Sequence, residues 1–124
     1  MRFKVVANLE ERFGTPKGRL RHYYDHGIDE YPGLTECEYE KLADELASKP
    51  VDNKRILGFQ TNKLTGNDHR ERHIKYDIVT NDFVVYSWEM GYQSPSIISL
   101  HKRTKEQYDK QKELHYEDEI PPWL

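Results

Sequence analysis

The chain has 124 residues, 35% of them hydrophobic and 33% charged, with one cysteine and a formal net charge of -3. This length fits one compact domain, and we expect residues 1–124 to form a single domain with its core at about 19–116 and a tail at 117–124. The composition excludes a strongly basic nucleic-acid coat, an intrachain disulfide, and an apolar run near the ~20 residues that span a bilayer.

The first half of the chain predicts two helices. The segment before the breaker cluster GTPKG has no apolar leader pattern, so we expect a cytoplasmic site of residence or action. Residues 19–27 predict a short helix that ends at Gly27 in a left-handed conformation. Residues 35–48 predict a longer helix, with a capping box of Thr35 and Glu38 and an apolar stripe at steps of three and four residues.

The second half predicts four strands and a last helix. The strands are expected at 55–62, 73–77, 82–89 and 96–103, and a polar helix capped by Thr104 follows at 105–116. The expected fold class is α+β, with N-terminal helices packed on a roughly four-stranded antiparallel sheet and a C-terminal helix after it. The second face of such a sheet can stay open to solvent, and we expect a site there.

His22 and His26 stand four residues apart in RHYYDHG. If this stretch is helical, both imidazoles share one face. Three interpretations are open: a metal clamp, which lacks a third ligand and the glutamate of HExxH; a structural pair at a helix end; or acid–base groups that titrate near neutral pH.

Positive charge gathers in RERHIKYD. Alternation places His73, Lys75 and Asp77 on one face of the strand and Ile74 on the other. Because isoleucine prefers the core, we expect His73 and Lys75 to face solvent. This face is either an ordinary solvated one or, together with Arg72, a clamp for phosphate.

The last strand, SIISLHKR, carries a second polar set. Regular alternation places Ile98 and Leu100 on one face and Ser99, His101 and Arg103 on the other. Lys102 then falls on the side of Leu100, unless a bulge re-aims it. Ser99, His101 and Arg103 form either the solvent-facing side of a half-buried strand or part of a polar site.

These residue types suit RNA cleavage without a metal. One group takes the proton of the ribose 2′-hydroxyl, a second protonates the leaving oxygen, and cations stabilise the charged transition state. No Gly-rich phosphate loop or carboxylate cage is present, so we expect no cofactor and no metal.

The order of motifs resembles that of the phage- and polymorphic-toxin-associated nucleases of the barnase–EndoU–colicin–RelE group. The similarity covers about residues 20–103: an HxxxHG helix end, a TxxEYxxLA helix, a KYD–xxTNDFVV hairpin, and a last strand of the form I-x-S/T-x-x-K/R. It implies helices before a four-stranded sheet whose open face holds a ribonuclease site. The chain departs from the pattern in SPSIIS, which replaces G-x-I-x-T.

The resemblance places a set of residues at positions that match the motifs of the group: His22, His26, Lys75, Tyr76, Asp77, Ser99 and Lys102. The roles that follow are our hypothesis for the mechanism. His26 or His22 would be the general base, and His101 the acid. Lys75 with Lys102 or Arg103 would hold the phosphate, while Ser99 and Tyr76 orient it and Arg72 and His73 contact the substrate. The implied partners are RNA, with tRNA as one candidate, and an immunity or antitoxin protein, without a membrane. The alternative is a non-catalytic phage or mobile-element protein that binds a protein or nucleic-acid partner.

Overall fold

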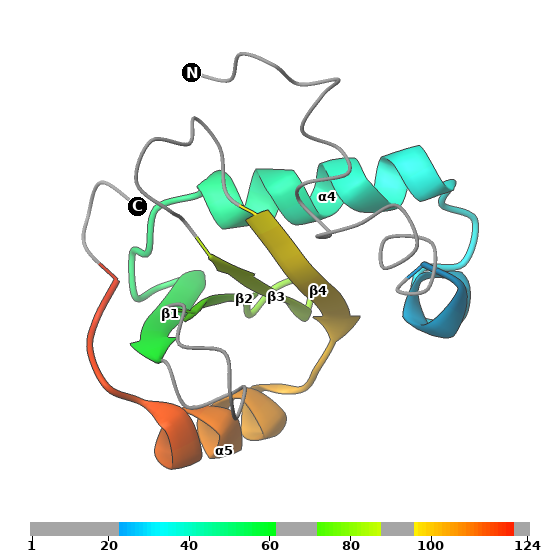
Figure 1. Ribbon diagram of the computed structural model, residues 1–124. Helices are drawn as coiled ribbons and strands as arrows, with labels where there is room; N and C mark the ends of the chain where they lie inside the picture. The colour runs from blue at the N-terminus through cyan, green and yellow to red at the C-terminus, as the bar shows by residue number, and fades with distance from the viewer. Residues whose placement is uncertain (1–22, 62–71, 88–95, 121–124) are drawn as a thin grey trace.

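The computed structural model describes residues 23–61, 72–87 and 96–120. Helical segments come first: η1 (Tyr23–Gly27), α3 (Ile28–Glu30) and α4 (Glu36–Ser48). The strands β1 (Ile56–Thr61), β2 (Arg72–Asp77), β3 (Asp82–Ser87) and β4 (Ser96–Lys102) then form an antiparallel sheet in sequence order, and α5 (Lys105–His115) follows. The predicted α+β fold is confirmed (Figure 1).

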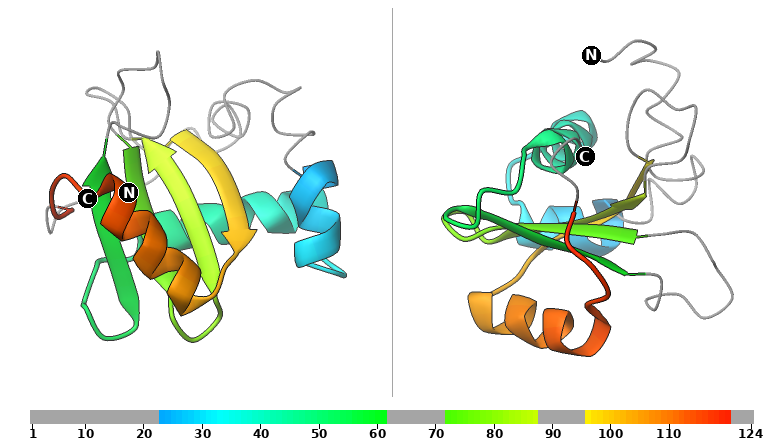
Figure 2. Two further views of the ribbon diagram at one scale, coloured as in Figure 1. Left: turned by 90° about the horizontal axis from the view of Figure 1, so that it is seen from below. Right: turned by 90° about the vertical axis from the view of Figure 1, so that its left-hand side faces the viewer.

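Helices cover both faces of the sheet (Figure 2). The apolar stripe of α4 packs on one face, in a cluster that includes Tyr39, Leu46, Val84 and Leu100. On the other face α5 contributes Tyr108, whose ring stacks on that of Tyr76 with centroids 5.1 Å apart. The prediction that the second face of the sheet is open to solvent is therefore wrong. The helix α5 covers this face although it is otherwise polar, because its one buried residue, Tyr108, packs into the core.

Local sequence explains how α4 begins and what positions it. The Thr35 hydroxyl accepts the Glu38 N–H, and the Glu38 carboxylate accepts the Thr35 N–H, so the predicted capping box is confirmed. The preceding turn places Gly33 at φ +88°, where an L side chain would be strained. The Tyr39 hydroxyl then donates to the Leu100 carbonyl (2.6 Å), which ties α4 to β4.

The helical conformation continues beyond Gly27. This residue has φ -63° and ψ -43°, and α3 follows directly, so the prediction of a left-handed helix end there is wrong. A Cβ at Gly27 would lie 2.8 Å from the Tyr23 ring and 3.2 Å from the Tyr39 ring. The glycine is needed because these two rings approach the backbone closely, rather than for an unusual φ.

Two features shape the sheet edges. The pairing of β3 with β4 shifts register between Val85 and Tyr86, which places Ile97 with Leu100 in the cluster under α4 and Ile98 in the cluster under α5. The prediction that Ile98 shares a face with Leu100 is therefore wrong. At the other edge, residues 117–120 of the expected tail lie along β1.

The segment is held there by backbone bonds. The Gln60 N–H donates to the Asp118 carbonyl (2.8 Å), and the Glu117 N–H donates to the Gln60 carbonyl (3.0 Å). Ile120 is buried. A Cβ added to Gly58 of β1 would lie 2.8 Å from its side chain, so the two pack closely.

Candidate functional site

Lys75 and His73 lie under α4 and not in solvent. Both have 0% exposure. The Lys75 ammonium donates to the Ala47 carbonyl (2.9 Å) and to the Lys49 carbonyl, at the end of α4. His73 Nε2 lies 3.1 Å from Gln60 Oε1. Alternation assigned these residues to the correct strand face, but the expectation that this face is exposed is wrong.

Burial also changes the acid–base properties of this pair. It lowers the pKa of Lys75 to about 8. Burial, with the charge of Lys75 as a second cause, lowers the pKa of His73 to about 4. His73 is therefore neutral at pH 7, and neither group is placed to contact a substrate. In the described structure Lys75 holds the end of α4 on the sheet, and His73 links β2 to Gln60 of β1.

Three further strand candidates, Arg72, Tyr76 and Ser99, are buried too. Tyr76 projects from the opposite face of β2, where its hydroxyl contacts Asn81 Oδ1 (2.6 Å) and the Arg103 carbonyl (2.9 Å). Arg72 and Ser99 are 2% and 8% exposed, so the described structure does not support the substrate contacts expected of these residues. Because consecutive strand residues point to opposite faces, Lys75 and Tyr76 cannot meet on one substrate.

Asp77 organises the turn between β2 and β3. Its Oδ1 accepts the N–H groups of Val79 (2.9 Å) and Thr80 (3.3 Å), and Arg55 binds both carboxylate oxygens. Burial alone would raise the pKa of Asp77, but these hydrogen bonds together lower it. The lysine–tyrosine–aspartate motif of β2 is thus structural throughout.

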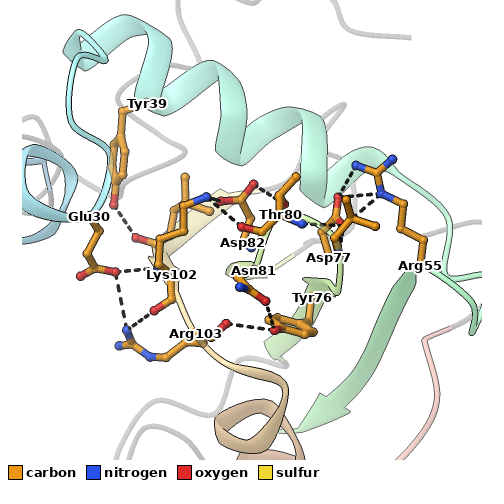
Figure 3. A network of polar contacts seen from close by, with 12 residues as sticks. Glu30, Tyr39, Arg55, Tyr76, Asp77, Thr80, Asn81, Asp82, Lys102 and Arg103 are labelled. Atoms are coloured by element: carbon orange, nitrogen blue, oxygen red, sulfur yellow. Dashed lines mark hydrogen bonds and ion pairs between the residues drawn. The ribbon is translucent and has the colours of Figure 1, made fainter.

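Polar side chains do converge at the end of β4 (Figure 3). The Glu30 carboxylate, at the end of α3, reaches the strand, and its Oε1 accepts the backbone N–H of Lys102 (2.6 Å). His101 Nδ1 lies 3.7 Å from Glu30 Oε2, and Arg103 Nη1 lies 3.6 Å from Glu30 Oε1. We call Glu30, His101 and Arg103 the Glu30 cluster.

Lys102, which lies next to the Glu30 cluster, has a structural role. Its ammonium contacts Asp82 Oδ1 (2.9 Å), donates to the Thr80 carbonyl (2.9 Å), and lies 4.8 Å from the centre of the Tyr31 ring. It therefore falls on the side of Leu100, as regular alternation predicts for this residue. With three such contacts, Lys102 ties β4 to the β2–β3 turn.

A shallow pocket of about 200 Å³ opens between that turn and the start of α5. The residues that line it come from the turn, from β4 and its extension, and from α5: Thr80, Asn81, Lys102, Arg103, Thr104 and Gln107. Arg103 belongs both to this pocket and to the Glu30 cluster, so the two features adjoin.

The HxxxH pair lies mostly outside the described residues. His22 precedes them, and His26 lies in η1 with its side chain outside what the structure describes. The distance from either imidazole to the Glu30 cluster is therefore not tested. Among the described residues, no group of three or more His, Cys, Asp or Glu side chains could hold a metal ion.

Glu30 is the site residue that sequence reasoning misses. It stands in the acid-rich segment IDEYPGLT, and it lies 72 positions before Lys102, whose amide it binds. The one local clue is that Glu30 directly precedes Tyr31, a core residue. This clue predicts that the backbone at Glu30 lies near the core, but it does not predict which strand the carboxylate contacts.

No family model matches the chain, and comparison with curated proteins and with solved structures found no significant match. The resemblance to the toxin-associated nucleases stays a prediction. In the part of the chain that the structure describes, no helix is long and apolar enough to cross a membrane. The geometry of the Glu30 cluster and the pocket is therefore the basis for a functional proposal.

Proposed function

We propose that the protein is a metal-independent endoribonuclease in which Glu30 and His101 are the acid–base pair and Arg103 contacts the phosphate. One observation supports this: the oxygens of one carboxylate lie 3.7 Å from His101 Nδ1 and 3.6 Å from Arg103 Nη1. The side chains of His101, Glu30 and Arg103 keep 12%, 23% and 34% of their surface exposed. The His101 Nδ1 atom that faces Glu30 is itself buried, so the ring would contact a substrate through its other edge. A base, an acid and a cation side by side suit cleavage by a 2′-hydroxyl.

The proposed reaction has one step in which two protons move. The Glu30 carboxylate takes the proton of a ribose 2′-hydroxyl, and the 2′-oxygen bonds to the adjacent phosphorus. The bond from phosphorus to the 5′-oxygen breaks, and the His101 imidazolium gives its proton to that oxygen. The Arg103 guanidinium stabilises the negative charge on the non-bridging oxygens. The products end in a 2′,3′-cyclic phosphate and a 5′-hydroxyl.

The local hydrogen bonds suit these roles. The Lys102 N–H donates to Glu30 Oε1 (2.6 Å), which fixes the plane of the carboxylate. Because the imidazole is already next to the base, a single phosphodiester can contact both groups.

The test compares isosteric variants on a labelled RNA in the presence of a chelator. Glu30→Gln keeps an oxygen that can accept the Lys102 N–H, but its amide cannot act as a base. We expect Glu30→Gln and His101→Asn each to cleave about 10²- to 10⁴-fold more slowly than the parent. Glu45→Gln, which makes the same change at an exposed position of α4, should cleave at the parent rate.

Variants that stay folded and cleave as fast as the parent would refute the assignment. A parent protein that binds RNA or a protein without cleaving RNA would favour the non-catalytic alternative. On the proposal, an immunity or antitoxin partner would act by covering Glu30 and Arg103, and it should protect RNA from the parent protein.

A further inference from the structure

The pocket beside Arg103 has a size that limits its ligand. Its volume is about 200 Å³, below the ~300–1,000 Å³ of sites that enclose whole organic ligands. It therefore has room for one small group of a larger molecule. None of its six lining residues is acidic, and two are cationic: Lys102 and Arg103.

Internal hydrogen bonds occupy four acceptor atoms around the pocket. Gln107 Oε1 accepts the Thr104 N–H (2.8 Å), and Thr104 Oγ1 accepts the Gln107 N–H (3.1 Å). Asn81 Oδ1 accepts from the Tyr76 hydroxyl at 2.6 Å, the shorter of the two contacts of that hydroxyl. The Thr80 carbonyl accepts from Lys102.

The remaining polar side-chain atoms around the pocket are hydrogen-bond donors. Among the described residues, nothing accepts a hydrogen bond from Gln107 Nε2, Asn81 Nδ2 or the Thr104 hydroxyl. The Arg103 guanidinium carries five N–H groups, and its contacts with described residues involve Nη1 alone. A small pocket lined by amide, hydroxyl and guanidinium donors, with the side-chain acceptors of Gln107, Thr104 and Asn81 already occupied, is complementary to an oxyanion.

We infer that this pocket holds a phosphate group of the nucleic-acid chain, next to the phosphate that the Glu30 cluster attacks. The identity of the ligand as nucleic acid rests on the proposed function, whereas the preference for a phosphate oxyanion rests on the pocket alone. Arg103, which adjoins both features, would lie between the two phosphates. The pocket would position the substrate and take no part in proton transfer.

The experiment measures binding without cleavage. The ¹⁵N-labelled protein is titrated with inorganic phosphate and, separately, with a single-stranded oligodeoxynucleotide, which lacks the 2′-hydroxyl. The reporter is the side-chain amide signal of Asn81, at constant ionic strength. The test variant is Gln107→Glu, because glutamate still accepts the Thr104 N–H and preserves the capping box while it replaces two donors with acceptors. Gln111→Glu, one turn later on α5 and outside the pocket lining, is the charge-matched control.

We expect saturable shifts of the Asn81 signal with both ligands, binding at least about tenfold weaker in Gln107→Glu, and a change of less than about twofold in Gln111→Glu. Because the oligodeoxynucleotide lacks the 2′-hydroxyl, its binding is measured whether or not the protein cleaves RNA, which separates this inference from the cleavage proposal. Absence of any shift in the parent, equal weakening in Gln107→Glu and Gln111→Glu, or binding of inorganic phosphate without the oligonucleotide would each overturn the inference.

Discussion

Replacing Lys75 with methionine should change how the stability of the protein depends on pH. The ammonium of Lys75 is completely buried and donates to two carbonyls at the end of α4, those of Ala47 and Lys49. Burial lowers its pKa from 10.5 to about 8. Methionine keeps the length and apolar stem of the side chain but cannot titrate.

The magnitude follows from the two pKa values. Between pH 8 and 10.5 the unfolded chain carries a proton on Lys75 that the folded chain has lost, so raising the pH favours the folded state. From pH 7 to pH 9.5 this one group should add about 2 kcal/mol to the free energy of unfolding. The gain is lost again as the pH falls through 8. The range stops at 9.5 because tyrosines of the unfolded chain begin to ionise near pH 10.

The measurement is urea unfolding of the parent and of Lys75→Met at pH 7 and pH 9.5. The free energy of unfolding of the parent minus that of the variant should rise by about 2 kcal/mol between the two pH values. Lys41→Met, at an exposed position of α4, is the control and should parallel the parent. A difference that does not change with pH would refute the reasoning, since it would mean that the carbonyls and the Tyr86 ring keep the ammonium charged.

Three further variants test the close packing, a buried hydrogen bond and the protonation of a buried histidine. Gly58→Ala should destabilise the fold by about 1–3 kcal/mol in urea unfolding, because its Cβ would lie 2.7 Å from the Ile74 carbonyl; an unchanged midpoint would contradict the close approach. Tyr39→Phe should cost about 1–3 kcal/mol, since the Leu100 carbonyl loses its buried donor, and a smaller loss would show that water replaces it. Between pH 7 and pH 4.5, His73 binds a proton in the unfolded state but stays largely neutral in the folded state, because its pKa there is about 4. The free energy of unfolding of the parent should therefore fall by about 2.5 kcal/mol more than that of His73→Gln over this range.

Local patterns were sufficient for α4 and for the order of the strands. The capping box of Thr35 and the stripe through Tyr39 predict α4 correctly, because both act within a few residues of the chain. Alternation in β2 also separates Lys75 from Ile74 correctly. Such signals depend on backbone geometry, which neighbouring residues determine.

The environment of each face could not be predicted in the same way. The helix α5 is so polar that only Tyr108 reveals its buried side, and covering the second face removed the expected open site. The lysine of β2 looked solvent-exposed because its partners are backbone carbonyls of α4, which no residue type encodes. Glu30 meets His101 and Arg103 only through the folding of distant segments.

The most direct test of the proposed function is the chemistry of the RNA ends. RNA incubated with the purified parent protein in the presence of a chelator is digested to short fragments, and their ends are identified by mass spectrometry. We predict 2′,3′-cyclic phosphate and 5′-hydroxyl ends, formed far more slowly by Glu30→Gln. Intact RNA, or fragments with 3′-hydroxyl and 5′-phosphate ends, would contradict cleavage by the Glu30 cluster.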